Sequence, residues 1–449
     1  MGQSIQDLDL NRDQRIRDPI HNLVSFSHQR DEDRMLWLLL STFPVQRLRR
    51  IKQLGFSEFV YPGATHSRFS HVIGAMQMAR RMLGVFEKND QFSDSKNHSL
   101  MRMATIAAAM LHDVGHGPYS HVFEEISSAL GIEEEHENLT KKIIEQTEIR
   151  GILEKFGILE QTIKFFTKEP GYSPYTTIIS SQMDCDRLDF LARDRYHTGI
   201  QSSSIDFEWL FDSLRIEEVH PDPIAGQKEF SFVVQEKGLS SIEEYVISYM
   251  KMYKEVYFHK TTRSVQHLVR DAMKGLVNLD QSKTKAIRQQ RLFSYLLNKK
   301  KRGIENFLLL DDSCFIHALH SIAEANLGDP SKLAERFFKR DTYKCLELPT
   351  SNSGKIKANL AGKFIDALKT DGIFYIDDIL PAKTIKQYDV MEKHFLQNIL
   401  VKKDGEAEPL GEVSNVVGSL GEKRVRLYFK TEQDREKAKV ILRKCQSAQ

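Results

Sequence analysis

The pattern of apolar and polar positions predicts a chain that is mainly helical. Apolar residues recur at helical spacing over residues 71–86, and residues 99–111 (SLMRMATIAAAML) are apolar on nearly every side, which is typical of a buried helix. The apolar run at residues 36–40 and the periodic segments 178–194 and 240–260 also favour helices. Helix is therefore the main element that we expect over the first half of the chain.

Strand patterns are few and lie late in the chain. Alternating residues favour strands at 373–376 (IFYI) and 424–429 (RVRLYF), with a short candidate at 230–234 and scarce signals before residue 220. An amphipathic helix is expected at 432–444. The change in character predicts a helical core over residues 1–340, followed by a small α/β lobe over residues 341–449.

Composition narrows the class of protein. Lys and Arg number 64 against 62 Asp and Glu, so no general affinity for polyanions follows. The four cysteines form no CxxC pair, which excludes a thiolate zinc site and fits a reducing compartment. The polar start predicts no signal peptide, and no apolar stretch reaches the roughly 18 residues of a membrane span. We expect a soluble cytoplasmic protein.

Histidines gather in one part of the chain and point to a metal. Seven of the 16 histidines lie between His66 and His136. The segment LHDVGHGPYSH brings His112, Asp113 and His116 together among glycines. Imidazoles beside a carboxylate suit a divalent ion that polarises a phosphoryl oxygen, and these ligands do not choose among Fe, Mn, Zn and Mg. A lone HD dipeptide occurs by chance in many proteins, whereas this density of groups favours a site.

Four blocks of sequence carry a family resemblance. They are DPIHN at residues 18–22, FPVQRLRRIKQLGFSEFVYPGATHSRFSHVIG at 43–74, LHDVGHGPYSHVFE at 111–124 and SQMDCDRLDFLARDRYHTGIQ at 181–201. In this order they resemble the HD-domain deoxynucleoside triphosphate triphosphohydrolases, a family of sterile-alpha-motif-and-HD-domain enzymes and bacterial relatives. The first block lies almost at the start of the chain, so we expect no sterile-alpha-motif domain. The resemblance implies an HD-domain helical core.

The resemblance also implies a role for each matched position. The metal ligands would be His71, His112, Asp113 and Asp186. The general acid–base group and its neighbours would be His116, His136 and Glu124. The residues that bind the triphosphate and the sugar of a dNTP substrate would be Gln53, Leu54, Arg68, His121, Arg187, Asp194, Tyr257 and Lys260.

A regulatory site is the least complete part of the resemblance. Members of the family that are controlled by nucleotides act as dimers or tetramers, so we expect a homo-oligomer and a nucleotide activator. Ser41 and Trp209 stand where the family's guanine site has an acidic residue and an arginine, which argues against GTP and leaves the activator open. The positions that match or lie near this pocket are Gln46, Arg49, Arg336 and Lys339.

The sequence alone is compatible with several functions. The preferred one is metal-dependent hydrolysis of dNTPs to deoxynucleoside and inorganic triphosphate. A nuclease or a phosphodiesterase for a signalling nucleotide would use the same metal site, and a nucleotide sensor would need no acid–base group. Nucleic-acid binding by the late lobe is a weaker alternative.

Overall fold

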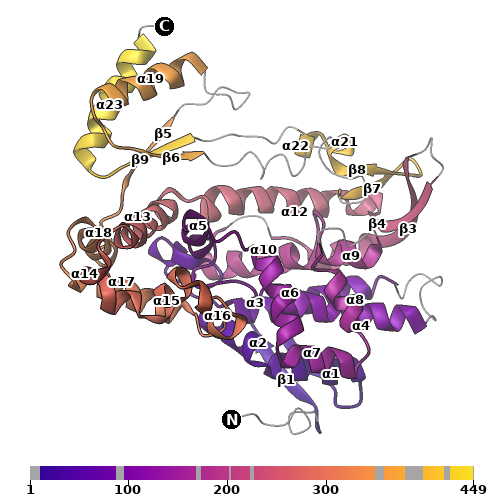
Figure 1. The fold of residues 1–449 in the computed structure, drawn as a ribbon. Helices are drawn as coiled ribbons and strands as arrows, with labels where there is room; N and C mark the ends of the chain where they lie inside the picture. Colours follow the sequence, from indigo (N-terminus) through magenta and orange to yellow (C-terminus); the bar gives the residue numbers. More distant parts are fainter. Residues whose placement is uncertain are drawn as a thin grey trace.

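The structure, a computed structural model, describes residues 11–86, 96–167, 173–201, 204–222, 227–348, 358–379, 398–418 and 425–447. Helices dominate these residues, as the apolar pattern predicts (Figure 1). None of the helices in the described ranges has both the length and the apolar character needed to span a bilayer. The mainly α fold class is confirmed.

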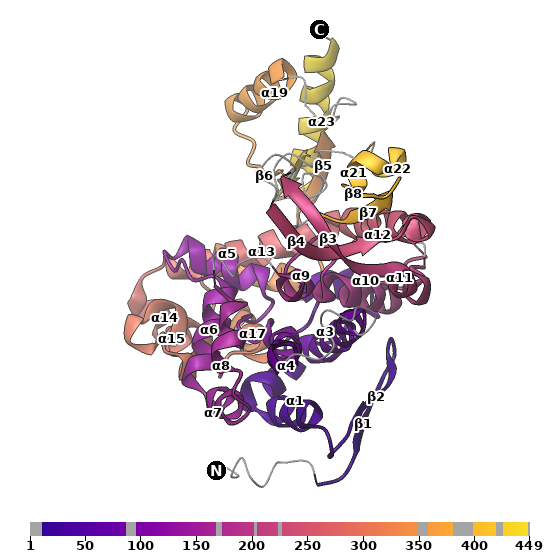
Figure 2. The ribbon, with the colours of Figure 1, turned by 90° about the vertical axis from the view of Figure 1, so that its right-hand side faces the viewer.

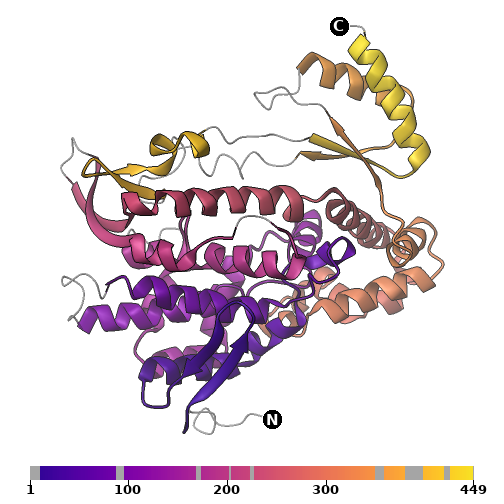
Figure 3. The ribbon, with the colours of Figure 1, turned by 180° about the vertical axis from the view of Figure 1, so that it is seen from behind.

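An antiparallel hairpin precedes the helices and was missed by the strand pattern. Strands β1 (Gln14–Asp18) and β2 (Asn22–Phe26) pair in register from Gln14 opposite Phe26 to Asp18 opposite Asn22. The Asp18 carboxylate closes the turn by accepting the backbone N–H groups of Ile20 and His21. The hairpin runs along one side of the helical core (Figures 2 and 3).

The centre of the core is a stack of long helices. Helix α3 (Arg68–Leu83) packs against α4 (Lys96–Leu111) and α10 (Cys185–Thr198), and α10 packs against α12 (Leu239–Met252). Figures 1 and 3 show α12, α10 and α3 one above another. The apolar sides of α4 explain its position, because Ala104 and the residues from Ile106 to Leu111 are all fully buried. This stack fixes the segments that carry the predicted metal ligands.

Two of the predicted helices are interrupted. The segment 178–194 was expected to be one helix, but α9 (Pro174–Ile179) ends at its second residue and α10 begins only at Cys185, because Asp184 caps the N–H of Arg187. The segment 240–260 ends as a π-helical turn (Tyr253–Tyr257), after which His259 caps α13 (Lys260–Val277). Local capping groups, which the apolar period does not report, set both boundaries.

The remaining helices surround this stack. They are α1 (Asp31–Ser41), α2 (Phe43–Arg47), the 3-10 turns Leu48–Arg50, Gly55–Phe59, Glu236–Gly238 and Lys299–Lys301, then α5 (His121–Ala129), α6 (His136–Gln146), α7 (Glu148–Lys155), α8 (Leu159–Lys164), α11 (Phe207–Ser213), α14 (Gln281–Arg288), α15 (Arg291–Leu297), α16 (Ile304–Phe307), α17 (Asp312–Glu324) and α18 (Asp329–Phe338).

A four-stranded sheet joins the core to a late part of the chain. Its order is β3 (Leu214–Asp222), β4 (Gln227–Val234), β7 (Leu400–Lys403) and β8 (Glu406–Pro409), with β4 and β7 parallel. The short helices α21 (Leu410–Val413) and α22 (Asn415–Gly418) follow β8. The strand predicted at 230–234 is confirmed within β4. Residues 398–418 thus return to the core, and a boundary at residue 340 stays a prediction.

The C-terminal lobe has a hydrophobic core of its own. A three-stranded antiparallel sheet with the order β5 (Lys344–Leu348), β9 (Val425–Phe429) and β6 (Ile376–Ile379) packs with α19 (Ala358–Thr370) and α23 (Glu432–Ser447). The lobe stands above the helical core (Figures 1 and 2). The strand predicted at 373–376 begins three residues later, as β6. The strand predicted at 424–429 is confirmed as β9, and residue 424 lies outside the described residues. The helix predicted at 432–444 is confirmed as part of α23.

We predict that the buried ion pairs of Arg193 are essential to this fold. Its side chain is fully buried and binds Asp18 and Asp189 through contacts of 2.8 Å. Arg193→Met would leave two carboxylates buried without their cation, which typically costs about 3–5 kcal/mol of unfolding free energy. Denaturant unfolding monitored by circular dichroism measures this loss.

The matched control is Arg150→Met. Arg150 is largely exposed and pairs with the similarly exposed Glu154 on α7. Such pairs contribute about 0–1 kcal/mol. Equal losses in the two variants would contradict the assigned importance of Arg193.

Candidate metal and active site

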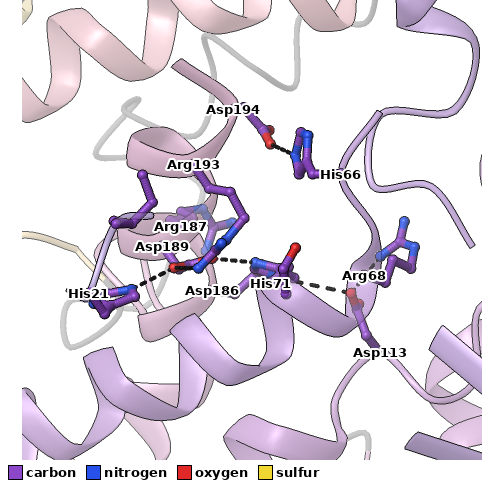
Figure 4. A network of polar contacts seen from close by, with 12 residues as sticks. His21, His66, Arg68, His71, Asp113, Asp186, Arg187, Asp189, Arg193 and Asp194 are labelled. Carbon is purple, nitrogen blue, oxygen red and sulfur yellow. Dashed lines mark hydrogen bonds and ion pairs between the residues drawn. The ribbon is translucent and has the colours of Figure 1, made fainter. Parts of the chain in front are cut away.

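The predicted metal ligands meet where α3, α4 and α10 come together. His71 lies on the buried face of α3, His112 follows the last residue of α4, and Asp186 lies in the first turn of α10. The Nε2 atoms of His71 and His112 are 3.2 Å apart, and Asp186 Oδ1 is 2.9 Å from His71 Nε2. Figure 4 shows His71 and Asp186 facing each other in this arrangement. These three side chains could hold one metal ion.

Asp113 completes the predicted set from the other side. Its Oδ1 lies 3.3 Å from His112 Nε2, and its Oδ2 lies 3.9 Å from His71 Nε2. Arg68 binds the same carboxylate at 2.6 Å (Figure 4). The fold therefore gathers all four predicted ligands, although Asp186 is 73 residues beyond Asp113 in the sequence.

The hydrogen bonds of the two imidazoles fit a cation. His112 Nδ1 lies 2.8 Å from the carbonyl oxygen of Ala109, and this acceptor requires the proton on Nδ1. His71 Nδ1 lies 2.8 Å from the Asp189 carboxylate, which favours the same tautomer. Two Nε2 lone pairs then face each other at 3.2 Å, an arrangement that is repulsive unless a positive charge lies between them. Metal-binding histidines usually have their other nitrogen held in this way.

The electrostatics of the site also favour a positive charge. Burial disfavours the charged ring of His71, but Asp186 and Asp189 raise its pKa to about 10. Burial opposes ionisation of Asp186 as well, yet His112 and His71 hold the pKa of this carboxyl well below its usual range. The carboxylates are thus ionised at neutral pH, and a divalent ion would take the place of the proton that they favour on His71.

A network of charged residues around Asp189 positions His71. The sequence did not lead us to predict this network. Asp189 lies one turn after Asp186 and binds His71 Nδ1 at 2.8 Å and His21 Nε2 at 2.7 Å. Arg193 binds the same carboxylate (Figure 4). The DPIHN block and the Asp186-to-Asp189 spacing were the available signals. They are visible in the sequence, but the partners lie more than 100 residues apart.

A second cluster contains the predicted acid–base residues. Glu124 Oε1 lies 3.1 Å from His136 Nδ1 and 3.6 Å from His116 Nδ1, and the two imidazole rings stack with centroids 4.1 Å apart. Burial and the neighbouring Arg68 lower the pKa of His116 to about 4. Burial opposes the charge on His136, but Glu124 raises the pKa of that ring. Asp113 Oδ1 lies 3.2 Å from His116 Nε2 and joins this cluster to the metal ligands.

Two predicted phosphate-binding residues lie beside these clusters. Arg68 is nearly buried, and its Nε donates to Ser120 Oγ at 3.0 Å while Nη1 binds Asp113. His121 begins α5, has an exposed side chain and lies 3.3 Å from Glu124 Oε2. The structure brings both residues to the metal and acid–base groups.

The predicted sugar-binding residues form a connected group around Asp194. The carboxylate of Asp194 binds His66 Nε2 at 2.8 Å through Oδ1 and accepts the Tyr257 hydroxyl at 2.6 Å through Oδ2. The backbone N–H of Gln53 donates to the carbonyl of His66, and Leu54 follows directly. The side-chain oxygen of Gln53 is buried without a hydrogen-bond partner. His66 was not assigned a role from the sequence.

The other two cations predicted to bind phosphate, Arg187 and Lys260, have fewer contacts with the residues of the site. Arg187 is bound by the Asp184 carboxylate and the Ser181 carbonyl at the start of α10, next to Asp186. Lys260 is exposed at the first position of α13, and its carbonyl accepts the Tyr428 hydroxyl. Arg187 thus lies near the metal ligands, whereas the position of Lys260 depends on the contact between the core and the C-terminal lobe.

The residues predicted for an activator lie in two separate groups. Arg49 donates to the Gln46 side chain at 2.8 Å and lies over the Phe69 ring. At the end of α18, Arg336 donates to the Lys430 carbonyl, and Lys339 pairs with Glu335. The two departures from the family pattern are also engaged locally, since Ser41 donates to the Trp37 carbonyl and Trp209 to that of Lys237.

Comparisons with known proteins identify the family of the chain. The HD domain family matches residues 68–193 and the HD associated region matches residues 225–292. The protein YwfO of Bacillus subtilis is 30% identical over 92% of this chain and 91% of its own length. The deoxynucleoside triphosphate triphosphohydrolase SAMHD1 of Gallus gallus is 22% identical over 92% of this chain and 71% of its own length. A solved phosphohydrolase of Bacteroides thetaiotaomicron covers 93% of this chain with a TM-score of 0.69 and 24% identity, a likeness in fold.

We predict that single changes in the ligand set remove the metal. His112→Ala and Asp186→Ala each delete one donor from the group at the junction of α3, α4 and α10, so the purified variants should contain little metal and show no hydrolysis while they remain folded. Asp189→Asn should instead weaken metal affinity by about 10–100-fold, because Asp189 orients His71 and is not one of the predicted ligands. It should also lower the free energy of unfolding, because the buried Arg193 and His21 pair with the same carboxylate.

Metal content by plasma mass spectrometry and secondary structure by circular dichroism provide the test. His28→Ala serves as the control, because His28 lies at the surface and pairs with Asp13. A full complement of metal in both the His112 and the Asp186 variants would refute this ligand assignment.

Proposed function

The chain belongs to the HD-domain family of phosphohydrolases, and from that premise we propose that it hydrolyses deoxynucleoside triphosphates to deoxynucleoside and inorganic triphosphate. One observation carries the proposal: His66, Arg68 and His71 lie within six residues and bind, respectively, the sugar-site carboxylate Asp194, the HD carboxylate Asp113 and the metal-site residues. Groups for a sugar, a phosphate chain and a metal are therefore contiguous.

The spacing along α10 supports a nucleotide in this position. Asp186 and Asp194 are separated by eight residues of one helix, which corresponds to about 12 Å along its axis. Figure 4 shows Asp194 with His66 at one end and the metal-site residues at the other. A nucleoside with its first phosphate at the metal end would extend its sugar toward Asp194 and Tyr257.

The ligand set would hold the metal, and the chain supplies the other charges. A bound divalent ion would polarise a phosphoryl oxygen and lower the pKa of water beside it. His71, His112, Asp113 and Asp186 offer nitrogen and carboxylate donors, which suit Fe, Mn, Zn or Mg. Arg68, Arg187 and the exposed His121 offset the negative charge of the triphosphate, and Lys260 adds to them from the start of α13.

Proton transfer is assigned to the cluster around Glu124. His116 and His136 stack against each other and share this carboxylate, and His116 also contacts Asp113. We assign to His116 the transfer of a proton to the leaving 5′-oxygen, with His136 and Glu124 setting the orientation of its ring. Burial and Arg68 lower the pKa of His116 to about 4 without substrate, so the ring would gain this proton once the negative charge of the bound phosphates offsets Arg68. A protein that only senses nucleotides would not need such a cluster beside its metal ligands.

Tyr257 is the proposed filter for the sugar. Its hydroxyl donates to Asp194, so the ring is held in place at one wall of the sugar site. The T-shaped contact with Phe190, whose centroid is 5.8 Å away, supports the same orientation. A ring fixed in this way would exclude a 2′-hydroxyl group and leave room for a deoxyribose.

Assembly and regulation belong to the same proposal. We propose a homo-oligomer, a dimer or a tetramer, in which Gln46 and Arg49 of one copy meet Arg336 and Lys339 of another around an activating nucleotide. Ser41 and Trp209 argue that this nucleotide is not GTP.

We predict the products from the proposed position of the phosphates. If the metal lies at the first phosphorus, cleavage falls between that phosphorus and the 5′-oxygen. Each dNTP, tested singly and in mixtures with Mn²⁺ or Mg²⁺, should then give intact inorganic triphosphate in phosphorus NMR and a deoxynucleoside by chromatography. A monophosphate or orthophosphate as the clean product would refute this reading and point to another HD phosphohydrolase.

His116→Ala tests whether the hydrolysis takes place at this site. The variant should retain metal and bind substrate, while its kcat should fall by about 10²–10⁴-fold, the usual contribution of general acid–base help. His317→Ala, which changes an exposed histidine in the middle of α17, serves as the control. Unchanged turnover in the His116 variant would contradict the assigned proton transfer.

A further inference from the structure

A single buried carboxylate on α17 connects two separate segments of the site. Asp312 lies in the first turn of α17 and is 7% exposed. Its Oδ2 accepts the backbone N–H of Lys52 at 2.8 Å, and its Oδ1 accepts the backbone N–H of Tyr119 at 2.8 Å. Both oxygens therefore bind main-chain donors, which fixes the two segments more firmly than side-chain contacts would.

Each of these donors lies next to a proposed substrate residue. Lys52 precedes Gln53 and Leu54, which belong to the sugar-binding group. Tyr119 lies two residues before His121, which begins α5 and contacts Glu124. The separation between the sugar group and the phosphate and proton-transfer groups is thus set partly by the width of one carboxylate.

The segment at Tyr119 needs such support, because its backbone is strained. Tyr119 has a φ of +50° and Ser120 a φ of +40°, values that favour glycine. The Tyr119 ring stacks on Phe56 with centroids 4.1 Å apart, and Ser120 accepts a hydrogen bond from Arg68. The strained turn thus faces the site on one side and is held by the core and Asp312 on the other.

The chemistry of this position favours an ionised carboxylate over the uncharged amide. Burial raises the pKa of Asp312 to about 6, although the N–H groups of Lys52 and Tyr119 oppose the rise. Asparagine would avoid the cost of a buried charge, but its amide nitrogen cannot accept a hydrogen bond. Only the carboxylate accepts both donors.

We propose that Asp312 is a positioning residue that holds Gln53 and Leu54 at a fixed separation from His121 and Glu124. This inference rests on the proposed function for its effect on turnover. The clamp itself, which consists of the two main-chain hydrogen bonds, is independent of the substrate.

Hydrogen–deuterium exchange of Asp312→Asn tests the clamp. The matched control is Asp311→Asn on the neighbouring residue, which binds Arg50 and caps the N–H of Cys314. Asn is also a good N-cap, so the control loses only its charge. Peptides that contain Lys52 and Tyr119 should exchange faster in the Asp312 variant alone, with metal content unchanged.

Turnover of the same variants tests positioning. The kcat of Asp312→Asn should fall roughly tenfold or more relative to Asp311→Asn, since a hydrogen bond to a charged group is lost, and KM for the dNTP should rise because Gln53 and Leu54 move. Exchange rates equal to those of the control, or faster exchange with unchanged kcat and KM, would overturn the proposal.

Two outcomes remain distinguishable from these. A wild-type protein that hydrolyses no dNTP contradicts the proposed function alone, and the exchange difference still decides whether the clamp exists. If Asp312→Asn does not fold, wild-type exchange decides: protected amides at Lys52 and Tyr119 support the clamp, and rapidly exchanging ones overturn it.

Discussion

The carboxylate of Asp189 is the interaction on which the arrangement of the site depends. A buried charge is costly unless it is paired, and this one is paired by His21, His71 and Arg193 from three different segments. Those partners come from the β1–β2 hairpin, from α3 and from α10 itself. The three segments must therefore be packed together before the charge of Asp189 is compensated. The same packing turns the Nε2 atom of His71 toward the other proposed metal ligands.

Acidic and basic side chains alternate across the site, starting from Asp189. Asp113 lies between the proposed metal ligands and the proposed acid–base cluster, with contacts to His112 on one side and to His116 and Arg68 on the other. The Glu124 carboxylate contacts the histidines of the second cluster. Each cation is thus adjacent to an anion, and under the proposed function these charges would be in place before the substrate binds. Preorganised charge of this kind is the main way in which enzymes stabilise phosphoryl transfer.

The sequence was informative where the signal is local. The apolar faces of α3 and α4 follow from periodicity, and the HD segment with its histidines marks the site before any contact is known. The resemblance supplied Asp186 and the sugar residues. The β1–β2 hairpin was missed because its strands are five residues long and half-exposed, and the break before Cys185 because capping by Asp184 interrupts an otherwise helical pattern. Asp189 and Asp312 could not be assigned positioning roles, since His21 and His71 lie more than 100 residues from Asp189, and Lys52 and Tyr119 lie more than 190 residues from Asp312.

Anomalous diffraction from crystals grown with Mn²⁺, recorded on both sides of the manganese absorption edge, tests whether the four proposed ligands hold the metal. We expect a peak about 2 Å from His71 Nε2, His112 Nε2 and the carboxylates of Asp113 and Asp186. A peak enclosed by His116, Glu124 and His136, with none at the first position, would contradict it, because those side chains would then be metal ligands and no longer the group that transfers the proton.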